Sequence, residues 1–75
     1  MDPMTAGQLL RLYRNQSNLN QQAVADALGV TRTSVSNWEN DKTPPFLGRL
    51  DALFDLLDLT DAQRKALVHA WRNDG

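Results

Sequence analysis

Apolar residues along this chain recur every three or four positions, which is the spacing of one face of an α-helix. The first stripe contains Ala6, Leu10 and Tyr13. It predicts a helix that begins near Thr5, a residue type that caps helices, and runs to about Gln16. No stretch alternates apolar and polar residues for long enough to make a β-strand. The pattern therefore predicts an all-α fold.

Two shorter helices are expected next. Asn20 is a candidate N-cap for a helix over Gln21–Leu28, and Gly29 closes it because glycine adopts the left-handed conformation without steric strain. Thr31 is the N-cap of a third helix that reaches about Glu39. The residues expected on the buried sides of these two helices are Val24, Ala25, Leu28, Val35 and Trp38.

The last third of the chain predicts two more helices, which gives a compact five-helix bundle. Pro44 and Pro45 stop the third helix, and a fourth is expected over about Phe46 to Leu57. Thr60 followed by Gln63 has the form of a capping box and opens a fifth helix that runs to about Arg72. The apolar residues of these two helices are Leu50, Leu53, Phe54, Leu57, Ala66, Leu67, Ala70 and Trp71. With 75 residues, a single domain over positions 1–75 is expected.

Composition narrows the functional classes. The chain has no cysteine and a single histidine, His69, which has no second metal-ligand type in suitable spacing beside it. Neither a metal site, a cofactor site nor the nucleophile set of an enzyme is therefore expected. No apolar run approaches the roughly 20 residues needed to cross a bilayer. We expect a non-enzymatic protein with no membrane association, located in the cytoplasm.

The formal net charge of −1 argues weakly against nucleic acid as a partner, but the charge is unevenly distributed. Through residue 49 there are five basic and four acidic side chains, whereas from residue 50 onward there are three basic and five acidic ones. The excess of acid thus lies in the C-terminal helices. Those helices are a candidate surface for a protein partner.

The segment over about residues 20–40 has the form of a helix-turn-helix. Ala25 lies where two short helices must cross closely, and Gly29 lies at the turn between them. Val35 and Trp38 are spaced one helical turn apart and hold the second helix on the core. In such a motif the second helix faces outward and enters the major groove of DNA.

At these residues the sequence resembles the Cro/phage-repressor (xenobiotic-response-element type) helix-turn-helix family. The resemblance covers roughly residues 6 to 60 and implies a λ-repressor-like DNA-binding domain. One departure is Asp41, where the family usually has glycine. The matching segments are Leu10–Arg14, Leu19–Gln21, Val24–Ala25, Leu28–Thr31, Val35–Asn40 and Lys42–Pro44, followed by Leu50, Leu53 and Leu57.

Four polar residues of the third helix share the face opposite Val35 and Trp38. In an arbitrary helix such a face is merely solvated, but in a helix-turn-helix we expect it to contact bases. Arginine donates two hydrogen bonds to guanine, and asparagine pairs in the same way with adenine. The expected base contacts are Arg32, Thr33, Ser36 and Asn37.

The resemblance also implies contacts to DNA phosphates. Gln21 opens the second helix, where free backbone N–H groups meet a phosphate, and its alternative is an exposed polar residue. Thr31 is expected mainly to cap, while Asn40 and Lys42 resemble a second phosphate clamp. Arg11 and Arg49 are peripheral candidates for which solvated surface charge is an equal alternative. The expected phosphate contacts are Gln21, Thr31, Asn40 and Lys42.

Arg14 and Glu39 are interpreted as structure. In the family an arginine at this point of the first helix forms a salt bridge with the glutamate that ends the third helix. Removing one partner of such a pair costs on the order of 3 kcal/mol or more. The alternative for Arg14 is a phosphate contact.

The fifth helix carries more apolar surface than a small monomer needs, and so does the first helix at Leu9 and Leu12. Excess apolar surface suggests self-association. The candidate dimer surface comprises Leu56, Leu67, Val68 and Trp71. In the alternative, the fifth helix folds back on the first.

These features predict a sequence-specific regulator that binds double-stranded DNA, most simply as a repressor that forms a homodimer on a pseudo-palindromic operator. The alternative is a helix-turn-helix antitoxin or anti-activator that acts on a protein partner through the acidic C-terminal helices.

Overall fold

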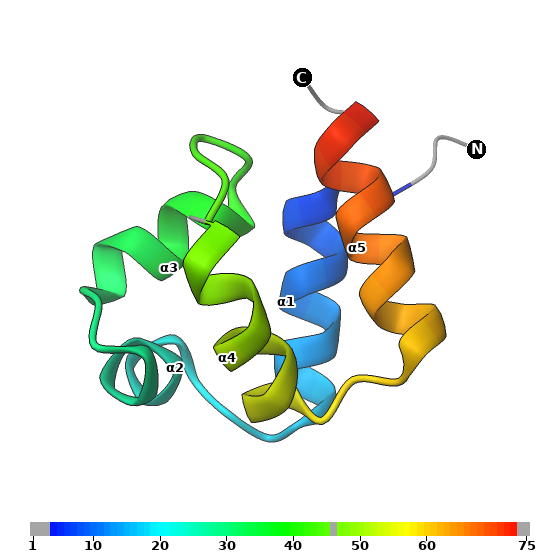
Figure 1. Cartoon of the computed structure of the whole chain (residues 1–75). Helices are drawn as coiled ribbons and strands as arrows, with labels where there is room; N and C mark the ends of the chain where they lie inside the picture. Colours follow the sequence, from blue (N-terminus) through cyan, green and yellow to red (C-terminus); the bar gives the residue numbers. More distant parts are fainter. Residues whose placement is uncertain (1–3, 46, 74–75) are drawn as a thin grey trace.

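The computed structural model describes residues 4–45 and 47–73, and within them the chain forms helices and no strand, as predicted (Figure 1). The predicted boundaries agree with the structure to within about one residue. Phe46, the expected first residue of the fourth helix, lies outside the described residues. The helices are α1 (Ala6–Gln16), α2 (Gln21–Leu28), α3 (Arg32–Glu39), α4 (Leu47–Leu57) and α5 (Asp61–Asn73).

Side-chain caps determine where four of the helices begin. Each cap accepts a hydrogen bond from the backbone N–H three residues later, at 2.7–3.2 Å. The side-chain oxygen of Gln63 accepts a hydrogen bond of 2.9 Å from the backbone N–H of Thr60, which completes the predicted capping box. The capping residues are Thr5, Asn20, Thr31 and Thr60.

Left-handed residues lie in the connections that follow the first four helices. Gly29 has φ of 68° and closes α2 as predicted. Three non-glycine residues take the same conformation in the other connections, namely Asn18, Asp41 and Asp58, with φ of 53–60°. Asparagine and aspartate tolerate this region better than other side chains, because their short polar groups bond locally.

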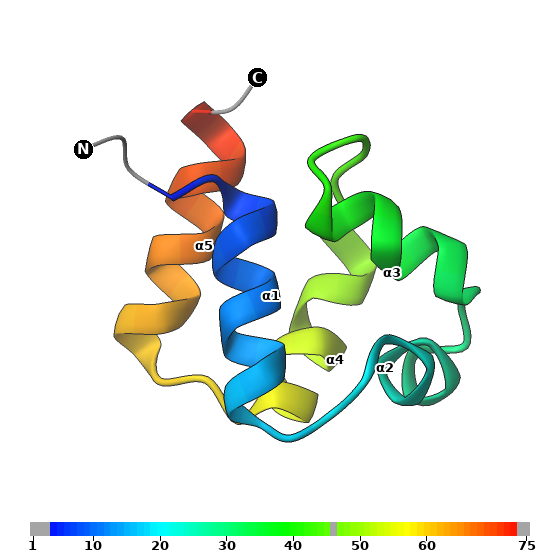
Figure 2. The same cartoon turned by 180° about the vertical axis from the view of Figure 1, so that it is seen from behind.

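The helices form two groups around α1. Figures 1 and 2 show α1 between α5 on one side and α3 on the other, with α4 between α1 and the pair formed by α2 and α3. α2 packs against α3 and α4, and α1 packs against α3 and α5. α3 therefore lies at the edge of the molecule on a scaffold made by the other helices. Within the described residues, none of the helices is long and apolar enough to cross a membrane.

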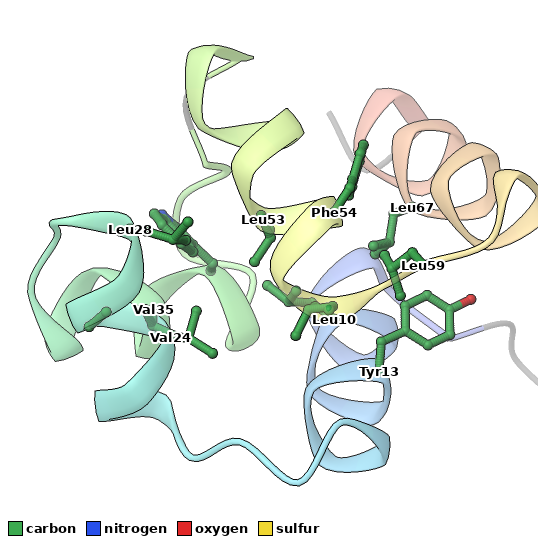
Figure 3. Close-up of a cluster of buried hydrophobic side chains, with 12 residues drawn as sticks. Leu10, Tyr13, Val24, Leu28, Val35, Leu53, Phe54, Leu59 and Leu67 are labelled. Atoms are coloured by element: carbon green, nitrogen blue, oxygen red, sulfur yellow. The ribbon is translucent and has the colours of Figure 1, made fainter.

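One core joins all five helices (Figure 3). The residues predicted for it from the first four helices are buried, apart from Leu50, which is only partly buried. Two leucines that the helix-turn-helix pattern does not include, Leu59 and Leu67, complete the core beside Tyr13. Leu67 has no exposed surface, so its assignment to a dimer surface is wrong. Its side chain is part of the core that holds α5 in place.

Candidate nucleic-acid interface

α2 and α3 cross closely at small residues. Ala25 is fully buried at the middle of α2, and the backbone N–H of Val30 donates to its carbonyl oxygen at 3.0 Å. Because Gly29 reverses the chain directly after Leu28, α3 starts only three residues beyond α2. The turn thereby sets α3 across α2, with its polar face away from the core.

The outward face of α3 carries the four residues predicted to contact bases. Arg32 and Thr33 are exposed, and Ser36 and Asn37 are half-buried. Within the described part of the chain, the side chains of Arg32, Thr33 and Asn37 have no hydrogen-bond partner. Their donors and acceptors are therefore available to a ligand.

A polar hollow of about 510 Å³ opens beside this face, between α1, the start of α2 and α3. Arg14 and Glu39 neutralise each other within it, which leaves Arg11 and Arg32 as its net positive charge. The first turn of α2 adds backbone N–H groups that have no partner inside the helix. The hollow thus combines cationic side chains with a helix N-terminus, a combination that binds anions. Its lining comprises Arg11, Arg14, Asn20, Gln21, Gln22, Arg32, Glu39 and Asn40.

The Arg14–Glu39 salt bridge predicted from the sequence is present and forms the floor of this hollow. Arg14 Nε donates to Glu39 Oε2 at 2.6 Å and Nη2 donates to Oε1 at 3.0 Å. Nη1 donates to the Leu19 carbonyl at 2.8 Å, so the guanidinium also fixes the connection into α2. Both side chains are buried, with only 10% and 2% of their surface exposed. The pair ties α1 to the end of α3.

Gln21 is drawn into the same network. Its Nε2 donates to Glu39 Oε1 at 3.2 Å, and the residue is half-buried. A phosphate contact from this position therefore relies on the backbone N–H groups of the first turn, or on a rotation of the amide away from Glu39. The alternative of a simply exposed residue is wrong.

The remaining predicted phosphate contacts lie at the two ends of α3. Thr31 accepts from the Ser34 N–H at 3.1 Å, so it caps as expected. Asn40 Nδ2 donates to Ser36 Oγ at 3.2 Å, and Lys42 is exposed in the loop that follows. Their contacts to DNA stay predictions.

Comparison with protein families decides the identity of the fold. The chain matches the model of a helix-turn-helix domain family over residues 5–67. It belongs to that family. No curated protein matches the chain closely enough to name a relative. The family membership confirms the resemblance inferred from Leu10 to Leu57 and indicates a DNA-binding regulator.

Arg49 has a structural role in this helix-turn-helix domain. Its Nη1 donates to the carbonyl oxygen of Leu28 at 2.6 Å, across from α4 to the last residue of α2. A cation at a helix C-terminus stabilises the unpaired carbonyls there. Of the two peripheral arginines, only Arg11 lines the hollow.

Sequence reasoning about the helix-turn-helix domain missed a contact between the end of α3 and the start of α1. Asp41 accepts hydrogen bonds from the Gly7 N–H at 2.9 Å and from Thr5 Oγ1 at 2.6 Å. The signal was the departure at position 41, where the family resemblance leads one to expect glycine. A charged residue there requires a reason beyond backbone conformation.

The rest of the candidate dimer surface is less exposed than expected. Leu56, Val68 and Trp71 are all partly buried and pack against the core. α5 lies against α1, as the alternative in which it folds back predicts. The large apolar residues described as exposed are Met4 and Leu12, at 45% and 39%.

The charge of the two C-terminal helices is not uniform. Asp51 and Asp55 lie exposed on α4, and Asp58 follows directly after it. In the described part of α5, Asp61 is outnumbered by three cationic residues, Arg64, Lys65 and Arg72. The acidic surface therefore belongs to α4, and the expectation of an acidic α5 is wrong.

Proposed function

We propose that this helix-turn-helix domain is a sequence-specific regulator of transcription that binds double-stranded DNA through the outward face of α3. The observation that carries the proposal is the polar set Arg32, Thr33 and Asn37, whose side chains have no partner among the described residues, beside the cationic hollow at the start of α2. The α3 side chains suit base edges in the major groove, and the hollow suits an adjacent phosphate.

The proposed mode of action is repression by a homodimer. One helix of eight residues reads only about four or five base pairs, so two subunits on a pseudo-palindrome double the sequence that is read. Their half-sites would lie about one helical turn of DNA apart, roughly 34–36 Å. Occlusion of a promoter is the simplest consequence of such binding. A regulator of this bacterial or phage type acts in the cytoplasm.

Selection of bound fragments from random double-stranded DNA tests the proposal. Enrichment of a pseudo-palindrome with this spacing would support both sequence reading and two-fold symmetry. The affinity for the enriched site should fall with increasing salt, because bound phosphates release counterions. Absence of binding at low salt would contradict the proposal.

The alternative is a helix-turn-helix antitoxin or anti-activator that acts on another protein. The observation that favours it is the exposed acidic row of Asp51, Asp55 and Asp58 along α4. For this class, substitution of these aspartates by asparagine would abolish capture of a co-purifying partner. If the protein is instead a DNA-binding regulator, the same substitutions should not lower its affinity for DNA.

A further inference from the structure

The end of α3 is fastened to the start of α1 by one carboxylate. Asp41 Oδ1 accepts from the Gly7 N–H, and Oδ2 accepts from the hydroxyl of Thr5. The same hydroxyl accepts from the Gln8 N–H at 3.2 Å, as the cap of α1. A carboxylate at a helix N-terminus is also favoured by the helix dipole. Asp41 therefore caps a helix that lies 34 residues away in sequence.

This contact depends on the absence of a side chain at residue 7. A Cβ atom there would lie 2.5 Å from the Glu39 carbonyl oxygen, 2.7 Å from that of Trp38 and 2.8 Å from Asp41 Oδ1. All three distances are shorter than carbon and oxygen tolerate. Glycine disfavours a helix by about 1 kcal/mol relative to alanine. Its presence in the first turn of α1 is explained by this close approach to α3.

Aspartate at position 41 is unfavourable on two other grounds. Its φ of 60° is strained for a residue with a side chain, and glycine would relieve the strain. It also places a negative charge between Asn40 and Lys42 in sequence, close to two residues that are proposed to contact DNA phosphates, although its carboxylate points to the start of α1. Both effects oppose DNA binding or stability unless the contacts to α1 outweigh them.

We propose that Asp41 is a positioning residue for DNA recognition, which holds the end of α3 and the loop with Asn40 and Lys42 in the orientation that DNA requires. The inference rests on the proposed function. Its basis is that the carboxylate joins the end of α3 to α1 at the point where the loop leaves the helix. A loop fixed before binding loses less conformational freedom when DNA binds.

The direction in which one substitution changes DNA affinity distinguishes this role from that of an ordinary surface acid. Asp41→Gly removes a negative charge and relieves the left-handed backbone, so without a positioning role it should strengthen DNA binding. With the positioning role it weakens specific binding, by about tenfold for the loss of two hydrogen bonds to a charged group. The salt dependence should stay the same, because Asp41 makes no phosphate contact.

Two variants serve as controls. Asp41→Asn keeps a side-chain oxygen that accepts from Gly7, tolerates the left-handed region and lacks the charge. It should therefore bind DNA at least as tightly as Asp41→Gly, within about threefold of the wild type. Lys42→Ala removes a cation from the adjacent position and should reduce the salt slope by about one phosphate contact.

Binding of the enriched DNA site is measured for all four proteins across a salt series, at a temperature where circular dichroism shows each to be folded. Hydrogen exchange at the Gly7 amide provides a readout without DNA and should be faster in Asp41→Gly. If the wild type binds the DNA site and Asp41→Gly binds it equally or more tightly, the role of Asp41 is overturned, while the proposed function is not. Failure of the wild type to bind any DNA would overturn the proposed function and the inference with it.

Should Asp41→Gly not fold, Thr5→Val carries the test. It leaves the charge of Asp41 and its bond from Gly7 in place, but removes the second donor together with the cap of the Gln8 N–H. We expect a loss of DNA affinity of about threefold to tenfold with an unchanged salt slope. Unchanged affinity in this variant would contradict the proposal.

Discussion

Arg14 binds both carboxylate oxygens of Glu39, so the first helix and the end of the third are joined by a two-point contact in the interior. The pair has no unsatisfied side-chain atom among the described residues, because Leu19 and Gln21 complete its hydrogen bonds. A buried pair that is fully bonded tolerates removal of both partners better than removal of one.

We expect Glu39→Leu to destabilise the fold by about 3–5 kcal/mol, because it leaves the Arg14 guanidinium buried without a counter-charge. Urea unfolding measures the change. Asp55→Ala removes one partner of the other described pair, Asp55–Arg64, which is largely exposed. It should change the stability by less than about 1 kcal/mol. Comparable losses in the two variants would contradict a structural role for Glu39.

Arg32→Ala should weaken binding to the enriched site by about 1–3 kcal/mol while leaving binding to mixed DNA nearly unchanged. The reason is that a contact to a base edge contributes only at the correct sequence. Arg72→Ala is the matched control, since it removes the same charge from the exposed face of α5 on the other side of α1. Equal effects of the two substitutions would show that Arg32 contributes only general charge.

Arg49→Met should lower the stability by about 1–2 kcal/mol and leave DNA affinity unchanged in the folded protein. The hydrogen bond from its guanidinium to the Leu28 carbonyl is lost, while methionine keeps much of the apolar contact of the side chain. Thermal unfolding and a DNA titration are measured on the same sample. A loss of DNA affinity with a smaller salt slope would instead identify Arg49 as a phosphate contact.

Ala25→Leu should destabilise the protein by about 1–3 kcal/mol, because the fully buried Cβ lies where α2 crosses α3 and leaves no room for a larger group. Ala27→Leu is the control on the same helix, where residue 27 is exposed. Leucine there should be tolerated within about 0.5 kcal/mol. Tolerance of leucine at both positions would argue against the close crossing of the two helices.

Sedimentation at micromolar concentration tests how the protein self-associates. If α5 forms the dimer surface, Trp71→Ala should shift the wild-type dimer toward monomer, because part of Trp71 remains exposed beside Trp38. Leu12→Ala addresses the more exposed apolar residue on α1. A monomeric wild type, or dissociation by Leu12→Ala alone, would exclude α5 as the interface.

The local signals in the sequence predicted most of this structure. Caps such as Thr31 and stops such as Gly29 act through their own backbone, so their effect can be read from a few neighbouring residues. The buried face of each helix follows from its period in the same way. The family resemblance added the Arg14–Glu39 pair, which joins residues 25 positions apart.

The contacts that could not be predicted are long-range and specific to this chain. Nothing near Gly7 or Asp41 indicates that the two residues meet, because their approach is decided by how α1 and α3 pack. The sequence places Leu67 on a dimer surface wrongly because its burial, too, depends on how the helices pack. An apolar stripe predicts that a helix face will be buried, but not whether it packs against the same chain or against a second copy.

Because α1 lies between α3 and α5, it separates the outward face of α3 from that of α5. Substitutions on these two faces do not contact each other, so their effects on the free energy of unfolding should be additive. A substitution that moves α1, such as one at Gly7, should alter the positions of both α3 and α5. DNA specificity can therefore change through α3 while a partner surface changes through α5, provided that α1 keeps its position.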